Sequence, residues 1–477
     1  MDSRQSPPDP PKRVLPIRAV VLGAGSGSRM KSTLPKVIHP VAGRPMIEWV
    51  IEATSSLDPI QTVVVVRSDA HQVTEILPDE VTPVVQPRQL GTAHALQIAL
   101  GVVHLDENEH VLVVPADTPL ITAQTLEKMT KLHRRTGSAV TCLTAKMDDP
   151  TGYGRVVRNG WGRVERIVEH ADTTTSEREI NEINGGIYLF DGALIREAVG
   201  RVERANAQGE YYLPDVVAIL GADGHGISAY QTTAEELSGI NTQDQLALVA
   251  EIARLRINRG WMRQGVWMQD AGRVYIDTTV RLQAGVRIRP GVHLEGDTTV
   301  AGGTELGPDC FISDSRIGPD SKVWYSVLRD VSVGARAMVG PYASLRPGTV
   351  LADGAKVGTF VEVKDSEIGA GAKVSHLAYV GDTKVGEDAN LGAGTITANY
   401  DGYEKHPTRI GRGARIGSNT VLVAPVEVGE EAFTAAGSAI TRDVSDGALA
   451  VERSPQREIS EYSRRRQERY EAGTSQD

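Results

Sequence analysis

Two different spacings of apolar residues divide this chain of 477 residues. In the first part, strand-like apolar runs at residues 17–22, 62–67 and 111–114 alternate with stretches of helical spacing at residues 45–55, 93–100 and 123–133. This alternation predicts βαβ units and a mostly parallel sheet. Ligands of such sheets bind outside the carboxyl ends of the strands, where we expect candidate site residues.

The second part repeats every six residues. Aliphatic residues followed by glycine recur at this interval, for example at Ile368, Val385 and Ile410, each with an aliphatic residue six positions later. Further registers run through Val280, Val286, Val292 and Thr298, and through Val428, Thr434 and Ile440. Hexapeptide repeats are typical of a left-handed parallel β-helix, in which each inward residue stacks on its counterpart one coil away. An ordinary glycine-rich strand region would show fewer such registers.

Glycine counts support the division, with 22 glycines up to residue 271 and 26 in residues 272–450. Residues 242–263 have helical spacing and no glycine before Gly260, which predicts a connecting helix. Residues 463–477 are polar, so we expect a frayed tail whose arginines are solvated. The expected division is a disordered extension (1–16), an α/β domain (17–241), a linker helix (242–271), a β-helix domain (272–460) and a polar tail (461–477).

Composition excludes several classes of protein. Apolar residues make up 40% and charged residues 23%, which fits a globular protein and not a wholly disordered one. The 51 Lys and Arg against 61 Asp and Glu give a net charge of −10, which argues against general nucleic-acid binding. Cys142 and Cys310 have neither disulfide-framework nor metal spacing, so we expect reduced core thiols. No apolar run approaches the roughly 18 residues of a membrane span and residues 1–11 lack the apolar stretch of a signal peptide, so we expect a cytoplasmic protein with no membrane partner.

The first candidate site directly follows the first predicted strand. Gly23, Gly25 and Gly27 would let backbone N–H groups approach phosphate oxygens, while Arg29 and Lys36 would supply cations. The run does not match GxxxxGK[ST], and a plain strand-to-helix turn remains an alternative.

With Arg29-Met30 and Pro35-Lys36-Val37, this segment resembles the sugar-1-phosphate nucleotidyltransferases. The later motifs follow the order of one narrower family, the bifunctional N-acetylglucosamine-1-phosphate uridylyltransferases and glucosamine-1-phosphate N-acetyltransferases. These motifs are Gln86, Leu90-Gly91-Thr92-Ala93-His94, Val114-Pro115-Ala116-Asp117, Gly154-Arg155, Glu169-His170, Glu182-Ile183-Asn184 and Gly239-Ile240-Asn241.

The resemblance implies a role for each residue of this first set. The nucleotide site would contain Leu22, Gly23, Ala24, Gly25, Arg29, Lys36, Gln86, Gly91, Thr92, Pro115, Ala116 and Asp117. Gly154, Glu169 and Asn184 would bind the N-acetylglucosamine part, and Asp117 with Asn241 would hold Mg²⁺. Attack of a sugar phosphate on UTP needs in-line positioning and charge neutralisation, and oxygen ligands suit Mg²⁺. A lone Asp at a strand end would otherwise be a helix cap.

Three positions depart from the family pattern. Leu22-Gly23-Ala24-Gly25 replaces the family's leucine-alanine-alanine-glycine. Pro115-Ala116 replaces tyrosine-glycine or serine-glycine, and Gly185 replaces threonine or alanine. Local contacts to the nucleotide or sugar depend on these positions, because Pro115 has neither an aromatic ring nor a backbone N–H.

The β-helix carries the second set of motifs of the same family, so the resemblance covers about residues 17–460. By similarity, His376 is the general base that accepts a proton from the amine of glucosamine-1-phosphate, a role suited to a group that titrates near neutral pH. Arg346, Lys364, Tyr379 and Asn390 would bind that sugar phosphate. The acetyl-CoA site would contain Ala393, Asn399, Tyr400, Ser418, Ala436 and Arg453. A surface or core histidine, and a Tyr400 that only stacks on the coil surface, are the alternatives.

The resemblance implies a two-site enzyme of UDP-N-acetylglucosamine synthesis, and hence of peptidoglycan and cell-wall formation. It would acetylate glucosamine-1-phosphate from acetyl-CoA, then couple N-acetylglucosamine-1-phosphate to UTP with loss of pyrophosphate, as a homotrimer that uses Mg²⁺. One alternative is a sugar nucleotidyltransferase whose β-helix only oligomerises. Another is a non-catalytic assembly or regulatory subunit.

Overall fold

The computed structural model describes residues 15–106 and 108–474 and divides the chain into two compact units, Met1–Ile257 and Asn258–Asp477. The extension expected at residues 1–16 lies outside the described residues, except for Leu15 and Pro16. The other expected domain boundaries stay predictions.

The first unit is built on a mixed β-sheet with the strand order β11-β7-β10-β6-β1-β4-β5, to which β8 and β9 add a small extension. Its strands are β1 (Ile17–Leu22), β4 (Gln61–Arg67), β5 (Val81–Gln86), β6 (His110–Pro115), β7 (Val140–Lys146), β8 (Arg155–Arg158), β9 (Val164–Val168), β10 (Glu182–Asp191) and β11 (Ile227–Thr232). A small hairpin joins β2 (Pro40–Val41) to β3 (Arg44–Pro45). The helices are α1 (Met46–Ser55), α2 (His71–Thr74), α3 (Thr92–Leu100), α4 (Ala123–Thr136), α5 (Thr175–Arg178), α6 (Gly192–Gly200) and α7 (Asp215–Ala222).

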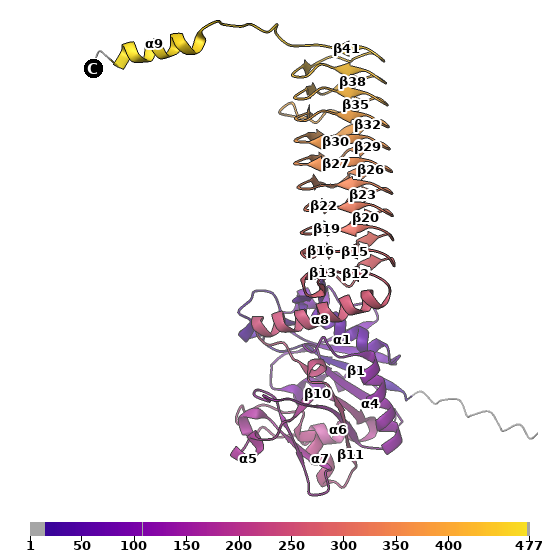
Figure 1. Cartoon of the computed structure of the whole chain (residues 1–477). Helices are drawn as coiled ribbons and strands as arrows, with labels where there is room; N and C mark the ends of the chain where they lie inside the picture. The colour runs from indigo at the N-terminus through magenta and orange to yellow at the C-terminus, as the bar shows by residue number, and fades with distance from the viewer. Residues whose placement is uncertain (1–14, 107, 475–477) are drawn as a thin grey trace, which may run out of the picture. The chain divides into compact units, whose positions relative to one another are not determined.

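Helices cover both faces of this sheet (Figure 1). One apolar cluster joins α1 and α4 to the sheet through side chains such as Ile47 and Leu126. The other joins α3, α6 and α7 through Leu96, Ile195 and Val217. Strands β1, β4, β5 and β6 run parallel, so their carboxyl ends lie at one edge of the sheet. These observations confirm the Rossmann-like α/β prediction.

Strand β10 runs antiparallel to both of its neighbours, β6 and β7, so the sheet is mixed. Its register against β7 shifts between Asn184 and Tyr188, and Gly186 within this irregularity has φ +69°. A bulge of this kind redirects the side chains beside it. Asn184 is therefore on a locally distorted part of the strand, which the sequence pattern did not reveal.

Helix α8 (Gln243–Arg263) occupies the segment for which a connecting helix is expected. Val249 and Ala253 on α8 are buried in an apolar cluster of the first unit. Asn258 is fully buried, and its Nδ2 donates to the carbonyl oxygens of Ala271 and Val274 at 2.8 Å each. These two bonds lie within the second unit and join the end of α8 to the first coil of the β-helix.

The second unit is a left-handed parallel β-helix of three sheets, as predicted, and Figure 1 shows its coils stacked on one another. The first sheet contains β12 (Trp267–Met268), β15 (Arg287–Ile288), β18 (Glu305–Leu306), β21 (Lys322–Val323), β24 (Met338–Val339), β27 (Lys356–Thr359), β30 (Lys373–His376), β33 (Asn390–Leu391), β36 (Arg415–Ile416), β39 (Phe433–Thr434) and β41 (Leu449–Ala450). The second contains β13 (Val274–Ile276), β16 (Val292–Glu295), β19 (Phe311–Ser313), β22 (Val327–Arg329), β25 (Ser344–Leu345), β28 (Glu362–Lys364), β31 (Tyr379–Gly381), β34 (Ile396–Ala398), β37 (Val421–Val423) and β40 (Ala439–Ile440). The third contains β14 (Arg281–Leu282), β17 (Thr299–Val300), β20 (Arg316–Ile317), β23 (Ser332–Val333), β26 (Val350–Leu351), β29 (Glu367–Ile368), β32 (Thr383–Val385), β35 (Thr408–Ile410) and β38 (Val426–Val428).

The six-residue period places one aliphatic residue of each strand inside the coil. Val374 pairs with Leu391 and Leu391 with Ile416, and all three are at most 3% exposed. Burying such a side chain stabilises the fold by about 1.5–3 kcal/mol relative to leaving it in water. An inward hydroxyl can be bonded too, as Ser366 Oγ donates to the carbonyl oxygen of Lys364 at 2.7 Å.

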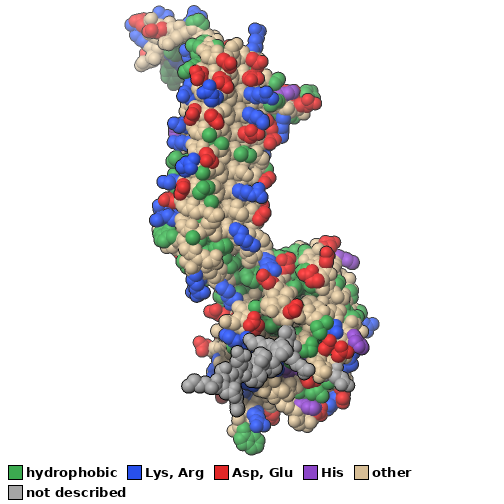
Figure 2. All heavy atoms as spheres, turned by 90° about the vertical axis from the view of Figure 1, so that its right-hand side faces the viewer, with side chains coloured by type: hydrophobic (Ala, Val, Ile, Leu, Met, Phe, Trp, Pro, Cys, Tyr) green, Lys and Arg blue, Asp and Glu red, His purple; other side chains and the backbone are tan. Residues whose placement is uncertain are grey.

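The expectation of a frayed C-terminal tail is not what the structure shows, because residues Tyr462–Thr474 form helix α9. An ion pair between successive turns supports this helix, with Arg464 within 3.4 Å of Glu468. The side chains of α9 that the structure describes are exposed. No helix within the described ranges has the length and apolar character needed to cross a membrane. Acidic and basic side chains are interspersed along the coils on the face drawn in Figure 2.

Candidate functional site

A cavity of about 330 Å³ lies at the carboxyl ends of β1, β5 and β6, where the parallel sheet predicts a ligand site. The predicted residues that line this cavity are Leu22, Gly23, Ala24, Gly25, Lys36, Gln86, Gly91, Thr92, Pro115, Asp117, Glu169 and Asn184. Arg29, Ala116, Gly154 and Asn241 do not line it. Segments far apart in the sequence therefore converge on one pocket.

Two side-chain oxygen atoms at this edge of the sheet contact the same lysine. The Nζ atom of Lys36 contacts the carboxylate of Asp117 and lies 3.1 Å from Oδ1 of Asn241. Arg29 also donates to the same amide oxygen of Asn241, at 3.1 Å. Because one ammonium reaches both oxygens, Asp117 and Asn241 are close enough to bind a single cation. Within the described ranges, no cluster of three His, Cys, Asp or Glu side chains could hold a metal, so a metal here would need ligands from substrate or water.

The turn before α3 is held against a distant segment. Gly91 has φ +112°, and a Cβ atom there would lie 2.4 Å from the carbonyl oxygen of Tyr211. The backbone N–H of Ala93 donates to that same oxygen at 2.9 Å, and Thr92 Oγ1 accepts from the N–H of Leu213 at 3.0 Å. Glycine is required at residue 91 because both the backbone conformation and the close approach exclude a side chain.

The sugar-binding candidates meet beside this cavity. The N–H of Asn184 donates to the carbonyl oxygen of Gly154 at 2.9 Å, and its Nδ2 donates to the hydroxyl of Tyr188 at 2.6 Å. A Cβ at Gly154 would lie 3.5 Å from Oε1 of Glu169, so these residues are neighbours although Gly154 does not face the cavity. Burial raises the pKa of Glu169, and the carboxylates of Asp215 and Asp172 raise it further.

The three departures from the family pattern have different surroundings. Ala116 is fully buried in the apolar core, whereas Pro115 lines the cavity. A Cβ at Gly185 would lie 2.7 Å from a methyl carbon of Leu237, so glycine is needed for Leu237 to pack there. The N–H of Gly23 donates to the carbonyl oxygen of Val65 at 2.9 Å.

Nine further residues line the cavity that the sequence analysis did not place in this site. They are Ser26, Val37, Gln89, Ala95, Gly186, Tyr188, Glu210, Leu213 and Pro214. Five of them, Ser26, Val37, Gln89, Ala95 and Gly186, stand within three residues of predicted positions, so proximity to the motifs was a usable signal for these five. Glu210, Leu213 and Pro214 come from a segment more than 100 residues away from the glycine-rich turns, and their place depends on the tertiary fold.

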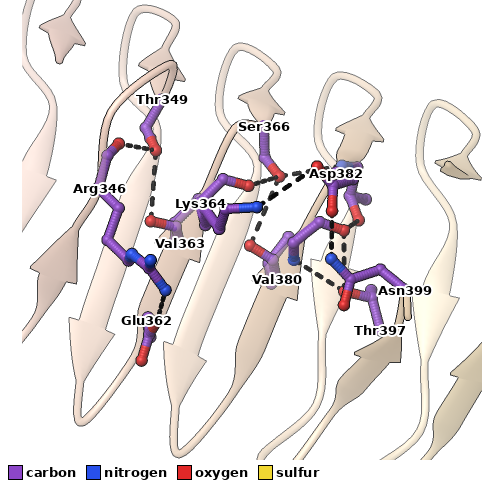
Figure 3. A network of polar contacts seen from close by, with 12 residues as sticks. Arg346, Thr349, Glu362, Val363, Lys364, Ser366, Val380, Asp382, Thr397 and Asn399 are labelled. Atoms are coloured by element: carbon purple, nitrogen blue, oxygen red, sulfur yellow. Dashed lines mark hydrogen bonds and ion pairs between the residues drawn. The ribbon is translucent and has the colours of Figure 1, made fainter. Parts of the chain in front are cut away.

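The second candidate site lies on the outer surface of the second sheet of the β-helix (Figure 3). Arg346 follows β25, and its Nη1 donates to Oε1 of Glu362 on β28 at 3.0 Å. Lys364 on the same strand lies 3.7 Å from Oδ1 of Asp382, and the Nδ2 of Asn399 donates to that carboxylate. Four successive coils thus place two cations, two carboxylates and an amide along one line (Figure 3).

Close contacts also fix the position of Tyr379. A Cβ at Gly381 would lie 2.5 Å from the Tyr379 hydroxyl and 2.7 Å from Nδ2 of Asn399, so Gly381 leaves room for both. Lys405 is a site residue that the sequence analysis missed. The neighbouring ammonium of Lys364 lowers the pKa of Lys405, so a third cation lies beside the predicted anion site. Its signal in the sequence was an insertion between hexapeptides, since Lys405 pairs with Tyr400 in a small bridge.

The other predicted acetyl-transfer residues follow one corner of the β-helix. His376 is exposed at the end of β30, and its carbonyl oxygen accepts from the N–H of Gly394 at 3.2 Å. The carbonyl oxygens of Ala393 and Ser418 accept equivalent bonds from the next coils, at 2.7 and 2.8 Å. Arg453 Nη1 donates to the carbonyl oxygen of Ala436 at 2.9 Å. Residues at this corner therefore form a continuous row of small side chains that begins at His376.

The remaining predicted residues lie close to this row. Asn390 is half-buried on β33, one coil after Lys373. Tyr400 is 62% exposed, and its hydroxyl donates to the carbonyl oxygen of Gly402 at 2.6 Å. Asn399 is buried, and its amide donates to the carboxylate of Asp382. The structure therefore groups Asn399 with Lys364 and Asp382, and not with the row of small side chains that begins at His376.

The fold and the two sites define a class of two-part transferases, in which a nucleotidyltransferase unit and a hexapeptide-repeat unit share one chain. Residues 19–178 match the model of the MobA-like NTP transferase domain, and residues 407–442 match the hexapeptide repeat of succinyl-transferase. The chain is 45% identical to the bifunctional protein GlmU of Streptomyces coelicolor over 459 residues, which cover 95% of each chain. It is 48% identical to the bifunctional protein GlmU of Heliobacterium modesticaldum, over 91% of this chain and 95% of that one. The chain therefore belongs to the family of bifunctional GlmU proteins, which confirms the predicted resemblance.

Proposed function

We propose that the chain is a bifunctional enzyme that makes UDP-N-acetylglucosamine by acetyl transfer and then uridylyl transfer. The observation that carries the proposal is the coexistence of two separate polar constellations, one at the carboxyl edge of the first sheet and one on the β-helix, with the residues that each reaction requires. A subunit that only assembles with other proteins would need neither of them.

In the uridylyl-transfer site, a phosphate oxygen of N-acetylglucosamine-1-phosphate attacks the α-phosphorus of UTP, and pyrophosphate leaves. The N–H groups of the turn after Gly23 and the ammonium of Lys36 bind the phosphates, which positions the nucleotide for in-line attack. Asn184 and Glu169 orient the sugar by hydrogen bonds. These residues act by positioning and charge neutralisation, without a covalent intermediate.

Mg²⁺ is the cation that fits the pair formed by Asp117 and Asn241. Carboxylate and amide oxygens are hard ligands, and Lys36 already shows that one cation reaches both. When bound, Mg²⁺ would neutralise charge on the phosphates. Lys36 would then be released from Asp117 to a phosphate oxygen.

In the acetyl-transfer site, the amine of glucosamine-1-phosphate attacks the thioester carbonyl carbon of acetyl-CoA, and the CoA thiolate leaves. His376 accepts the amine proton, a task that its exposed position at a corner makes accessible to substrate. Arg346, Lys364 and Lys405 bind the sugar phosphate, because three cations near one surface outweigh the local carboxylates Glu362 and Asp382. The row from Ala393 to Ala436 leaves room for the extended cofactor.

The enzyme is proposed to be a homotrimer. Tyr325, Tyr342, Phe360 and Leu377 form an apolar corner of the β-helix that ends beside His376, and each is at least 40% exposed in the single chain. The rings of Tyr342 and Phe360 stack with centroids 5.3 Å apart. All four residues have positive φ, a conformation that bulky side chains rarely adopt. Burial of this corner against a second chain would offset that strain.

The test is a product assay with matched variants. Purified protein is mixed with glucosamine-1-phosphate, acetyl-CoA, UTP and Mg²⁺, and we expect UDP-N-acetylglucosamine. His376→Ala should lower acetyl transfer by about 10²- to 10⁴-fold and leave uridylyl transfer to N-acetylglucosamine-1-phosphate intact, while Asp117→Ala should do the converse. His293→Ala, which removes a half-exposed histidine of the same β-helix, should change neither activity. Uridylyl transfer without any acetyl transfer in the unmodified protein would favour a β-helix that only oligomerises.

A further inference from the structure

The side-chain amide of Gln86 is held in one orientation at the cavity of the first unit. Gln86 ends β5 and is 3% exposed, and its Nε2 donates to the carbonyl oxygen of Gly91 at 3.2 Å. A backbone carbonyl oxygen can only accept a hydrogen bond, so the amide nitrogen and not the amide oxygen must face Gly91.

The same nitrogen has a second partner in His94. The Nε2 atom of Gln86 lies 2.9 Å from Nδ1 of His94. Since the amide nitrogen is a donor, Nδ1 must accept, and a neutral imidazole then carries its proton on Nε2. Both N–H groups of Gln86 are used within the protein. Its remaining polar atom, the acceptor Oε1, is what the side chain offers to a ligand in the cavity that it lines.

His94 is fixed in turn by the segment that holds the Gly91 turn. Its ring is near parallel to that of Tyr211, with centroids 6.4 Å apart. The N–H of Tyr211 donates to the carbonyl oxygen of Leu90 at 2.8 Å, and its own carbonyl oxygen accepts from Ala93 at 2.9 Å. Contacts with Tyr211 therefore hold both partners of the Gln86 amide.

We propose that His94 is a positioning residue that makes the base site select uracil over cytosine. This proposal rests on the proposed uridylyl transfer and deepens it. Uracil presents an N3–H donor at the position where cytosine presents an N3 acceptor, so the fixed Oε1 of Gln86 bonds uracil and repels the cytosine lone pair. Without an acceptor at His94, only the Gly91 carbonyl opposes rotation of the Gln86 amide, and a rotated amide presents N–H groups that suit cytosine.

A matched pair of variants separates this role from a structural one. In His94→Asn, Oδ1 takes the place of the acceptor Nδ1, whereas His94→Leu has a similar shape without an acceptor. In His94→Leu, the ratio of kcat/KM for UTP to kcat/KM for CTP should fall about tenfold, because KM for UTP rises. In His94→Asn, the same ratio should stay within about threefold of the parent value. An unchanged ratio in His94→Leu, or an equal fall in both variants, would overturn the proposal.

A second measurement reports directly on the unmodified protein. In ¹⁵N-histidine-labelled unmodified protein, the His94 signal, assigned by its loss from His94→Asn, should report an unprotonated Nδ1. A proton on Nδ1 would overturn the proposal. Failure of the unmodified protein to use UTP would contradict the proposed function itself, whereas turnover of UTP with unchanged preference in His94→Leu contradicts only the role of His94.

Discussion

The ammonium of Lys36 contacts the carboxylate of Asp117, which is 81 residues further along the chain, and also lies 3.1 Å from Oδ1 of Asn241. Both side chains of the ion pair are mostly buried, at 10% and 21% exposed. In this arrangement the Lys36 ammonium lies between the side-chain oxygens of Asp117 and Asn241. Lys36 and a bound metal ion would therefore compete for Asp117.

Lys36→Met should separate two effects of that competition. Without nucleotide, divalent cations should bind about fivefold more tightly, because Asp117 loses its competing partner. UTP should bind more weakly, because its phosphates lose a cation. Calorimetric titration with Mg²⁺ alone and with UTP measures both effects. Lys31→Met, an exposed lysine five residues away, is the control. Weaker metal binding in Lys36→Met would contradict the competition.

Gly91→Ala should destabilise the first unit and raise KM for UTP. The added Cβ would lie 2.4 Å from a backbone oxygen at a φ of +112°, and strain at such positions costs about 1–3 kcal/mol. Gly137→Ala is the matched control, because its φ is +57° but a Cβ there meets nothing within 4 Å. Urea unfolding followed by uridylyl activity should show the larger loss in Gly91→Ala. Equal losses would mean that the contact with Tyr211 does not matter.

Phe360→Asn should weaken the proposed trimer without unfolding the chain. Asparagine tolerates positive φ better than phenylalanine does, and Asn419 has φ 54° at a corner of the same β-helix. Light scattering across a dilution series should show dissociation at about tenfold higher protein concentration than for the parent. Phe433→Asn, which replaces another half-exposed phenylalanine of the β-helix, should not have this effect. A trimer unaffected by Phe360→Asn would place the interface elsewhere.

Acid should destabilise the first unit through a buried histidine pair. His133 is 1% exposed, its Nε2 lies 3.1 Å from Nδ1 of His110, and burial with the charge of His110 lowers the pKa of His133 to about 4. Burial also lowers the pKa of His110, although Asp191 opposes this. A folded pKa below the unfolded value near 6.5 gives stability that is complete above that value and lost as the pH falls toward 4, by about 3 kcal/mol for His133.

The urea concentration at which half of the uridylyl activity is lost should therefore be lower at pH 5 than at pH 7.5. His133→Gln should reduce this dependence, because a glutamine has no proton to gain. His104→Gln, whose parent side chain is 90% exposed, should leave it unchanged. A midpoint that is equally sensitive to pH in His133→Gln would assign the effect to other groups.

The glycine-rich turn shows how far local sequence reaches. Residues 22–36 are neighbours in the chain, so a strand followed by Gly23 and Gly25 already predicts a turn that can approach phosphates. The core position of Ala116 was not visible beside Pro115, because Pro115 is the last residue of β6 and only the packing decides which of the two neighbouring side chains faces the cavity. The same holds for Gly185, whose need for glycine comes from Leu237 on a distant segment.

The sequence by itself determined the β-helix, because each coil repeats the same inward residue and pairs only with the next coil, as Val374, Leu391 and Ile416 do. The six-residue period can be read from neighbouring residues alone, and the stacking of each coil on the next follows from it. Only the tertiary structure decided that Lys36, Asp117 and Asn241 share one point, and that Lys405 comes beside Lys364. Those contacts depend on how strands and loops far apart in the chain pack together. The spacing of residues along the sequence does not show which of these segments meet.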